Sequence, residues 1–234
     1  MQVQELKEFS ELEHDTWSTL FNNLKDNRAH QADPIFTEGI EILGLSGDRI
    51  PDLNEINKKL SKLTGWQAVP VKGFEEVDSF FKGLSEKQFP IGNFIRDNQD
   101  LSYTPAPDIF HDLYGHIPFF ANKDYADFNQ RFGEVALKYI DSPEKLKKFD
   151  RLYWFGLEFP LIDYPEGRRI FGGGLLSSFG ESNYALSDKP KVLSFDVEKI
   201  ANQDFRIDVY QEILFCLSSK EQLYNCLPDF EATI

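Results

Sequence analysis

The sequence predicts an α+β fold that is mainly helical, with a few short antiparallel strands around an open cleft. Three observations support this class. A chain of 234 residues can bury one sizeable core. Apolar residues, 41% of the total, recur at helical spacing in most segments and form only a few short extended runs. No linker, internal repeat or low-complexity stretch divides the sequence, so we expect one domain over residues 1–234.

The first part of the chain carries three helix signals. Ser10 and Glu13 form a capping box that opens a helix. Its apolar face consists of Trp17, Leu20, Phe21 and Leu24. A second helix is predicted over residues 34–43, and a third over 52–65 begins with the same capping signal.

Extended and helical segments then alternate. Residues 67–71 are short and extended, and Pro70 makes them an edge strand or a linker. We expect a helix over 74–84 and an extended segment over 88–95. The second half of the chain predicts a helix over 122–140, a helix over 142–158 that begins at Ser142 and Pro143, a turn at 165–168, an extended segment over 205–217 and a closing helix from residue 219.

Composition limits the partners of the protein. The formal net charge of −14 argues against nucleic acid and anionic membranes, because both require a basic surface. Two cysteines, Cys216 and Cys226, form neither a disulfide framework nor a metal motif, so we expect them to be reduced. The sequence shows no signal peptide and no apolar run of the length that a membrane span needs. We therefore expect a soluble, cytoplasmic protein.

Two of the four histidines lie five positions apart in the segment 107–118, which reads PDIFHDLYGHIP. On a regular α-helix, residues five apart are separated by about 140° around the axis. His111 and His116 therefore cannot point from one regular helix face, unlike the paired histidines of zinc proteases. Gly115 and Pro118 predict a helix that loosens and stops here, so that His116 turns back toward His111.

Glu158 is the best third ligand, because it lies in the most apolar run of the chain. A buried carboxylate requires a metal or a cation beside it. Two imidazoles and one carboxylate leave coordination positions open and are typical of non-haem Fe(II) sites that activate oxygen. Zinc also fits such a set, and spacing does not choose between the two metals. A purely structural role for the two histidines remains the alternative at this point.

The segment 172–180, GGGLLSSFG, contains no phosphate-binding motif, so a tight turn with close backbone approach is the better interpretation. Ser177 and Ser178 are then candidates to hydrogen-bond a histidine ligand and set its tautomer.

Three segments resemble the signature blocks of the aromatic amino acid hydroxylases, in the family's order and at its approximate distances. They are residues 103–118, 153–159 and 172–181. Residues 64–66 and 70–73 also resemble family positions, and the likeness is greatest to the short bacterial phenylalanine 4-hydroxylases. The resemblance implies a bare catalytic domain over residues 1–234, without a regulatory or tetramerisation domain, and a monomer. It also implies Fe(II) and a tetrahydropterin such as tetrahydrobiopterin in the cleft.

The resemblance further implies a role for individual residues. His111, His116 and Glu158 match the iron ligands. The positions that match the pterin site are Gly73, Phe74, Phe80, Asp112 and Tyr153. Those that match the amino acid pocket are Arg96, Thr104, Pro105, Trp154, Phe159, Gly174 and Ser178, with Arg96 suited to pair with the substrate carboxylate. Ser177 and Glu181 would support the ligand and pocket residues without contacting the metal or the substrate themselves.

The implied activity is phenylalanine hydroxylation to tyrosine, with one atom of O₂ entering the ring and the other the pterin, as part of phenylalanine catabolism. Hydroxylation of tryptophan or tyrosine, or at another ring carbon, stays open. A zinc-dependent hydrolase with Asp112 as general base and a non-catalytic metal protein are the alternatives from other classes. Without the resemblance, Trp154 and Phe159 read as core packing, and Arg96 as a surface ion pair with Asp97 or Asp100.

Overall fold

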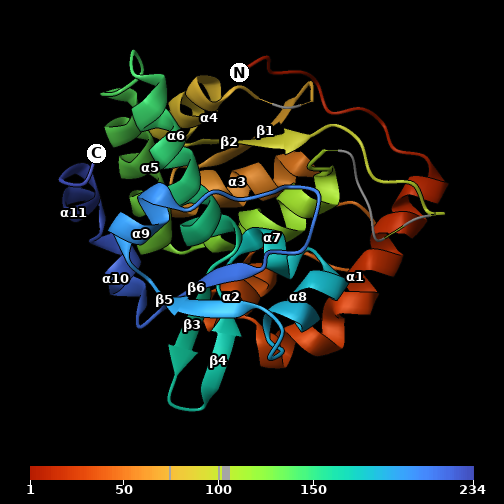
Figure 1. Ribbon diagram of the computed structural model, residues 1–234. Helices are drawn as coiled ribbons and strands as arrows, with labels where there is room; N and C mark the ends of the chain where they lie inside the picture. The colour runs from red at the N-terminus through yellow and green to blue at the C-terminus, as the bar shows by residue number, and fades with distance from the viewer. Residues whose placement is uncertain (74, 100, 102–105) are drawn as a thin grey trace.

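The computed structural model describes residues 1–73, 75–99, 101 and 106–234 (Figure 1). Helices dominate it, which confirms the mainly helical class. The α-helices are α1 (Glu11–Gln31), α2 (Pro34–Leu43), α3 (Leu53–Leu63), α4 (Val77–Ser85), α5 (Lys123–Leu137), α6 (Pro143–Tyr153), α7 (Gly173–Leu176), α8 (Phe179–Ala185), α9 (Val197–Asn202), α10 (Lys220–Tyr224) and α11 (Leu227–Glu231). Three further helical segments are η1 (His111–His116), η2 (Ile117–Ala121) and η3 (Trp154–Glu158).

The helix signals near the N-terminus are confirmed. The capping box forms at the start of α1, where the Glu13 carboxylate accepts the backbone N–H of Ser10 at 2.9 Å. Helix α2 ends at Gly44, whose φ of 72° lies in the left-handed region that glycine adopts without strain. Asp52 caps α3 by accepting the backbone N–H of Asn54.

The strands pair mostly in parallel, so the prediction of antiparallel strands is wrong for all pairs but one. β1 (Gln67–Val71) runs parallel to β2 (Gln88–Gly92). In the larger sheet, whose order is β4-β3-β6-β5, only β3 (Leu161–Tyr164) and β4 (Gly167–Ile170) form an antiparallel hairpin around the predicted turn. β6 (Ile213–Leu217) is parallel to both β3 and β5 (Lys191–Ser194). Helices α4 and α9 provide crossovers that return the chain in the same direction.

Several predicted boundaries also differ. The extended segment expected over 205–217 is a strand only from Ile213, and a loop precedes it. Helix α4 starts at Val77, later than expected, and α5 ends at Leu137. Pro70 lies in β1 at the edge of its sheet, where its carbonyl accepts the backbone N–H of Gln4.

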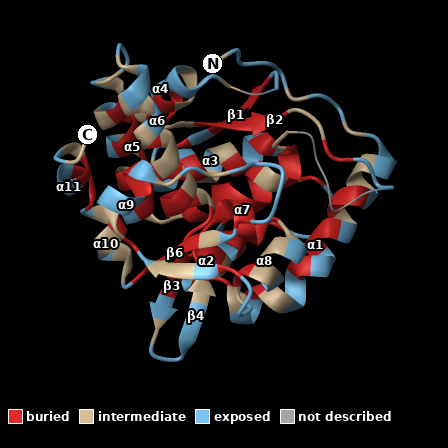
Figure 2. Cartoon of the chain, in the orientation of Figure 1, coloured by how far each residue is buried: buried red, intermediate tan, exposed pale blue. Residues whose placement is uncertain are grey.

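Aromatic rings fill much of the core of this chain, which contains 22 phenylalanines. The buried apolar side chains form one cluster that extends from Trp17 in α1 to Phe230 in α11. Figure 2 shows the buried residues concentrated in the middle of the molecule, around α7. Phe110, immediately before η1, stacks on Tyr114 at 4.7 Å and meets the edge of Trp17 at 5.1 Å. Helix α1 thereby fixes the segment that carries the two histidines.

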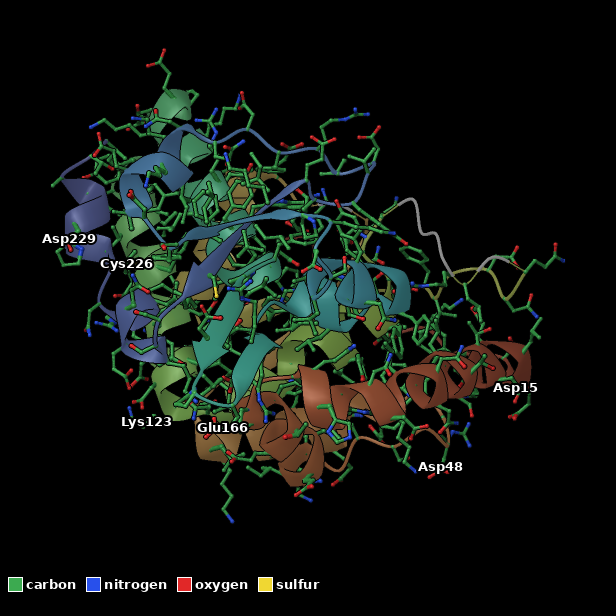
Figure 3. The ribbon with its side chains drawn as sticks, turned by 60° about the horizontal axis from the view of Figure 1, so that its bottom comes forward. Asp15, Asp48, Lys123, Glu166, Cys226 and Asp229 are labelled. Carbon is green, nitrogen blue, oxygen red and sulfur yellow. The ribbon has the colours of Figure 1, made fainter. Side chains whose placement is uncertain are left out.

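Acidic side chains are spread over the outside of the molecule. Asp15, Asp48, Glu166 and Asp229 are exposed and lie in separate parts of the chain (Figure 3). A dispersed negative surface is the ordinary solvated arrangement. Among the described helices, none has both the length and the apolar character needed to cross a bilayer.

Candidate functional site

His111 and His116 lie at the two ends of the π-helix η1. In this segment the backbone N–H of Ile117 bonds to the carbonyl of Asp112, five residues earlier. Because five residues make up about one turn of such a helix, both imidazoles point to the same side. The departure from a regular α-helix that the sequence predicted is therefore confirmed, but it extends over the whole of η1. Gly115 serves a different purpose: a Cβ atom here would lie 2.5 Å from the carbonyl oxygen of Gly173 in α7.

Glu158 comes from a second π-helix, η3, and reaches both histidines. Its Oε1 lies 3.0 Å from Nε2 of His116, and its Oε2 lies 3.8 Å from Nε2 of His111. The two Nε2 atoms are 3.3 Å apart. The ligand atoms all lie within 4.8 Å of one another, and in the described ranges this is the single cluster of His, Cys, Asp or Glu side chains so arranged. The structure thus brings together the three residues that the sequence singled out.

The glycine run packs against this cluster with the close backbone approach that the sequence predicted, but it forms helix α7 with Gly172 as its N-cap and not a tight turn. A Cβ atom at Gly172 would lie 2.2 Å from the carbonyl oxygen of Glu158, and one at Gly173 would lie 2.5 Å from Cε1 of His116. At Gly174 it would lie 2.7 Å from Oε2 of Glu158. Since real Cβ contacts are essentially never this short, only glycine allows α7 to pack against the cluster.

Ser177 sets the tautomer of His111. Its hydroxyl donates to the carbonyl oxygen of Gly174 at 3.1 Å, so it accepts the Nδ1–H of His111 at 2.9 Å. Nε2 of His111 is then unprotonated and directed at Glu158. Burial lowers the pKa of His111 to about 4, although the nearby Glu158 opposes this, and the ring stays neutral. The prediction for Ser178 is wrong, because its hydroxyl instead accepts the backbone N–H of Glu181.

The cluster has the properties of a divalent metal site. Glu158 is ionised: burial raises its pKa, but His116 and His111 outweigh that effect and the net pKa is lowered. Oε2 of Glu158 is buried and accepts no hydrogen bond from any residue that the structure describes. Two imidazole Nε2 atoms and this carboxylate converge, and a metal ion held by all three would satisfy the carboxylate. The residues present therefore fit a metal held by two histidines and one carboxylate.

Asp112 borders the cluster on the side of β2. Its Oδ2 accepts the backbone N–H of Gly92 at 2.7 Å, while Oδ1 lies 4.0 Å from Nε2 of His111. Burial raises the pKa of this carboxyl to about 8, with Asp108 and Glu158 adding to the effect and His116 opposing it.

Two rings that match pterin positions meet next to the cluster. Phe80 in α4 packs edge-on against Tyr153 at 4.8 Å. Phe80 is half-buried, whereas Tyr153 is buried and its hydroxyl has no hydrogen-bond partner among the described residues. Gly73 is exposed, and Phe74 lies outside the described residues.

Arg96 is buried in an ion pair, so the alternative of a surface pair with Asp97 is wrong; Asp100 lies outside the described residues. Its Nε and Nη2 donate to the two carboxylate oxygens of Asp108 at 2.8 and 2.9 Å. Its Nη1 donates to the carbonyl of Leu101 at 3.3 Å. Asp108 also accepts the backbone N–H of His111, which links Arg96 to the start of η1. The predicted pocket residues Thr104 and Pro105 lie outside the described part of the chain.

Trp154 and Phe159 lie on one side of the cluster. Their ring centroids are 4.4 Å apart, and the tip of Phe159 lies 3.0 Å from the position of a Cβ on Gly174. Phe205 stacks on the other face of Trp154 at 4.2 Å. Phe159 is buried, and Trp154 is half-buried.

Glu181 supports this side rather than the metal cluster. Its carboxylate accepts the backbone N–H of Gln211 at 3.3 Å, on the side of the cluster where Trp154 lies. Sequence reasoning missed Asp108, Phe205 and Gln211. For Asp108 a signal was present, because it is an acid at the capping position of the helix that leads into His111.

Comparison with known proteins agrees with this geometry. The model of a family described as biopterin-dependent aromatic amino acid hydroxylases matches residues 2–234. The phenylalanine-4-hydroxylase of Chromobacterium violaceum is 39% identical over 229 residues, which are 97% of this chain and 77% of that protein.

Solved structures from the same organism show the same fold. The phenylalanine hydroxylase with bound iron(III) and oxidised 7,8-dihydrobiopterin superposes with a TM-score of 0.92 at 38% identity, over 98% of this chain and 83% of that one. The structure with iron and phenylalanine gives a TM-score of 0.91 at 38% identity, over 98% and 84% of the two chains.

Proposed function

Because this chain belongs to the biopterin-dependent aromatic amino acid hydroxylases, we propose that it is a non-haem Fe(II), tetrahydropterin-dependent monooxygenase that converts phenylalanine to tyrosine. The observation that carries the proposal is the convergence of His111, His116 and Glu158 on one point, with contacts of 3.0 to 3.8 Å. The iron, pterin and phenylalanine bound in solved relatives support it.

In this proposal the three ligands hold Fe(II). Ser177 keeps Nε2 of His111 free for the metal, and Gly173 leaves room for the His116 ring. When bound, the iron and the reduced pterin supply the electrons and the site for splitting O₂, so that the protein contributes positioning. Three protein ligands leave positions for oxygen.

The remaining roles follow from the surroundings of each residue. Phe80 and Tyr153 present rings against which a flat pterin can pack, and Asp112 and Gly73 are assigned to the same site by their matching positions. Arg96 would pair with the carboxylate of the amino acid, because Asp108 occupies only Nε and Nη2 and holds the guanidinium still. Trp154 and Phe159 would form the wall for the substrate ring beside Gly174 and Ser178. Phe74, Thr104 and Pro105 remain assigned by their matching positions.

A direct assay tests the proposal. The purified protein is loaded with Fe(II) and given O₂, tetrahydrobiopterin and, separately, phenylalanine, tyrosine or tryptophan. We expect tyrosine from phenylalanine, with slower or no product from the other two. A preference for tryptophan or tyrosine would replace the substrate assignment and keep the reaction. No hydroxylated product from any of the three, with zinc-dependent hydrolysis instead, would contradict the proposal.

The variant Glu158→Gln tests whether this carboxylate is a metal ligand. The amide cannot supply the negative charge that the metal requires, so iron binding and product formation should both fall by about 100-fold or more. Glu166→Gln is the control, because Glu166 is exposed in the turn between β3 and β4. Full activity in Glu158→Gln would refute the ligand assignment.

We further propose that residues 1–234 act as a single catalytic domain, a cytoplasmic monomer in phenylalanine catabolism, without nucleic-acid or membrane partners. The one continuous core, the dispersed acidic surface and two buried, unpaired cysteines support this. Light scattering after size exclusion should give the mass of one chain, 27.1 kDa.

A further inference from the structure

Gln211 is a buried residue in an otherwise exposed loop. The loop runs from α9 to β6 and crosses the middle of the molecule in Figure 1. Its side chains at Ile207 and Tyr210 are 74% and 48% exposed, whereas Gln211 is 6% exposed. A long polar side chain is rarely buried unless its hydrogen bonds are made, so its partners indicate what it does.

The carboxamide of Gln211 connects the loop to the indole of Trp154. Its Nε2 donates to the carbonyl oxygens of Arg206 at 2.7 Å and Val209 at 3.1 Å. Its Oε1 accepts the indole N–H of Trp154 at 3.1 Å. The reversed amide would place oxygen against two carbonyls and NH₂ against an N–H, so the network permits only one orientation.

Trp154 is otherwise held only through its faces. Phe159 packs on one face at 4.4 Å, and Phe205 stacks on the other at 4.2 Å with an angle of 8° between planes. Stacking restricts tilt of the ring but does not by itself prevent a rotation about χ1 that moves the indole sideways within its plane. Among the described residues, Gln211 is the hydrogen-bond partner of the indole nitrogen and therefore the group that stops this rotation.

The ring pair of Trp154 and Phe159 lies next to the candidate metal ligands. Phe159 and Oε2 of Glu158 both border Gly174, where a Cβ would lie 3.0 and 2.7 Å from them. Trp154 lies on the same π-helix as Glu158, and its carbonyl accepts the backbone N–H of Phe159 at 2.9 Å. A rotation of the Trp154 ring within its plane therefore changes the surface next to the ligand cluster.

We propose that Gln211 is a positioning residue that orients the indole of Trp154 and thereby places the aromatic ring of the amino acid relative to the metal. The consequence for the substrate rests on the proposed function, whereas the hydrogen bond itself does not. Glu181 completes the arrangement by accepting the backbone N–H of Gln211 at 3.3 Å. Loss of the carboxamide should raise KM for phenylalanine and increase the fraction of pterin oxidised without product, because the ring is less well placed.

The indole N–H signals of the full chain test the hydrogen bond without reference to activity. The chain contains three tryptophans, so ¹⁵N-tryptophan labelling of the diamagnetic Zn(II)-loaded protein gives three indole signals, and Trp154→Phe identifies one of them. In Gln211→Met, which keeps the length of the side chain, the Trp154 signal should move upfield and exchange with solvent about tenfold faster. The signals of the buried Trp17 and Trp66 should not move, which controls for the fold.

Gln211→Glu separates the two halves of the carboxamide. It keeps an oxygen acceptor for Trp154 and removes the donors to Arg206 and Val209. The stronger charged acceptor should shift the Trp154 signal downfield. This variant decides the point even if Gln211→Met fails to fold, because an unmoved Trp154 signal in either folded variant overturns the proposal.

A double-mutant cycle tests the consequence for the substrate. Gln211→Met should raise KM for phenylalanine about tenfold when Trp154 is present, and less than about twofold when it is Phe, since a phenyl ring has no N–H to hold. Equal factors in both backgrounds would show that Gln211 only stabilises the loop, and would overturn the proposal. If the unmodified protein formed no hydroxylated product, the proposed function would fail, while the indole signals would still decide the hydrogen bond.

Discussion

At the scale of single residues, hydrogen bonds from supporting residues fix the orientation of the side chains that face the candidate site. Ser177 accepts Nδ1–H of His111 because its own proton is used on the carbonyl of Gly174. Asp108 holds Arg96 and the backbone of His111 together, and Gln211 holds Trp154. In each case the hydrogen bond holds the side chain in one orientation among those that it could otherwise adopt.

Removing the Ser177 hydroxyl should weaken the metal site. In Ser177→Ala the His111 tautomer is no longer fixed, and loss of such a supporting group typically costs 10- to 100-fold in metal affinity. Competition with a chelator of known affinity measures the change. Ser178→Ala is the control, since that hydroxyl caps α8; its affinity should stay within about twofold, with about 1 kcal/mol less stability. Equal affinities in both variants would contradict the role given to Ser177.

Glu181 predicts a pH dependence of stability. Burial raises the pKa of its carboxyl from 4.5 to about 7, with Glu158 adding to the effect and the Gln211 N–H opposing it. Between these values the folded state binds more protons than the unfolded state, so the free energy of unfolding contributed by Glu181 falls as pH rises.

Glu181→Gln should remove that contribution while keeping an oxygen acceptor for the backbone of Gln211. Chemical denaturation of both proteins from pH 4.5 to pH 8 measures it. The variant should gain stability relative to the wild-type chain as pH rises toward 7, and then hold the difference constant. A difference that does not change with pH would show that the carboxyl keeps its ordinary pKa.

At the scale of elements, two π-helical segments and one glycine helix form the candidate site. The i to i+5 bonding of η1 brings together two histidines that an α-helix would separate. The same bonding in η3 presents Glu158, and α7 approaches both because its glycines have no side chains. The five-residue spacing of His111 and His116 therefore matches the i to i+5 bonding of the π-helix.

A methyl group at Gly173 should disturb this arrangement. In Gly173→Ala the new carbon would lie 2.5 Å from the ring of His116, so the ring must move and iron affinity should fall at least about tenfold. The control Gly180→Ala also creates a short contact, with the hydroxyl of Tyr210, but that side chain is half-exposed and can move away. Iron titration of both variants checks this, and an unchanged affinity in Gly173→Ala would contradict it.

At the scale of the whole molecule, Asp33 ties distant parts of the chain into one core. It is fully buried and caps α2 by accepting the backbone N–H of Ile35 at 2.9 Å. It also accepts the hydroxyl of Tyr164 in β3 at 2.5 Å and lies 3.5 Å from Lys220 at the start of α10. One carboxylate therefore connects the N-terminal helices with the sheet and the last helices.

Asp33→Ala should destabilise the molecule as a unit. It leaves a helix N-terminus, a tyrosine hydroxyl and an ammonium group without their shared partner, which should cost about 3 to 5 kcal/mol. Because the core is continuous, unfolding should remain a single transition with an unchanged denaturant slope. Asp15→Ala, on the exposed face of α1 in Figure 3, should change stability by less than about 0.5 kcal/mol. A second transition in Asp33→Ala would contradict a single cooperative core.

The sequence by itself determined the features that depend on neighbouring residues. The capping signals located α1 and α3, and the histidine spacing required an irregular helix. The apolar context of Glu158 indicated a buried carboxylate, and three residue blocks indicated the family. These rules act over a few residues, through local hydrogen bonds and steric exclusion, so they can be read without a fold.

Only the tertiary structure decided which distant groups meet. Ser177 and His111 are 66 positions apart, and Gln211 and Trp154 are 57 apart. The parallel strand pairs, the Arg96 pair with Asp108 and the atoms that exclude a Cβ from the glycines likewise depend on how elements pack. Such contacts arise when many side chains are buried at once, and no short stretch of sequence contains the partner that will be on the other side.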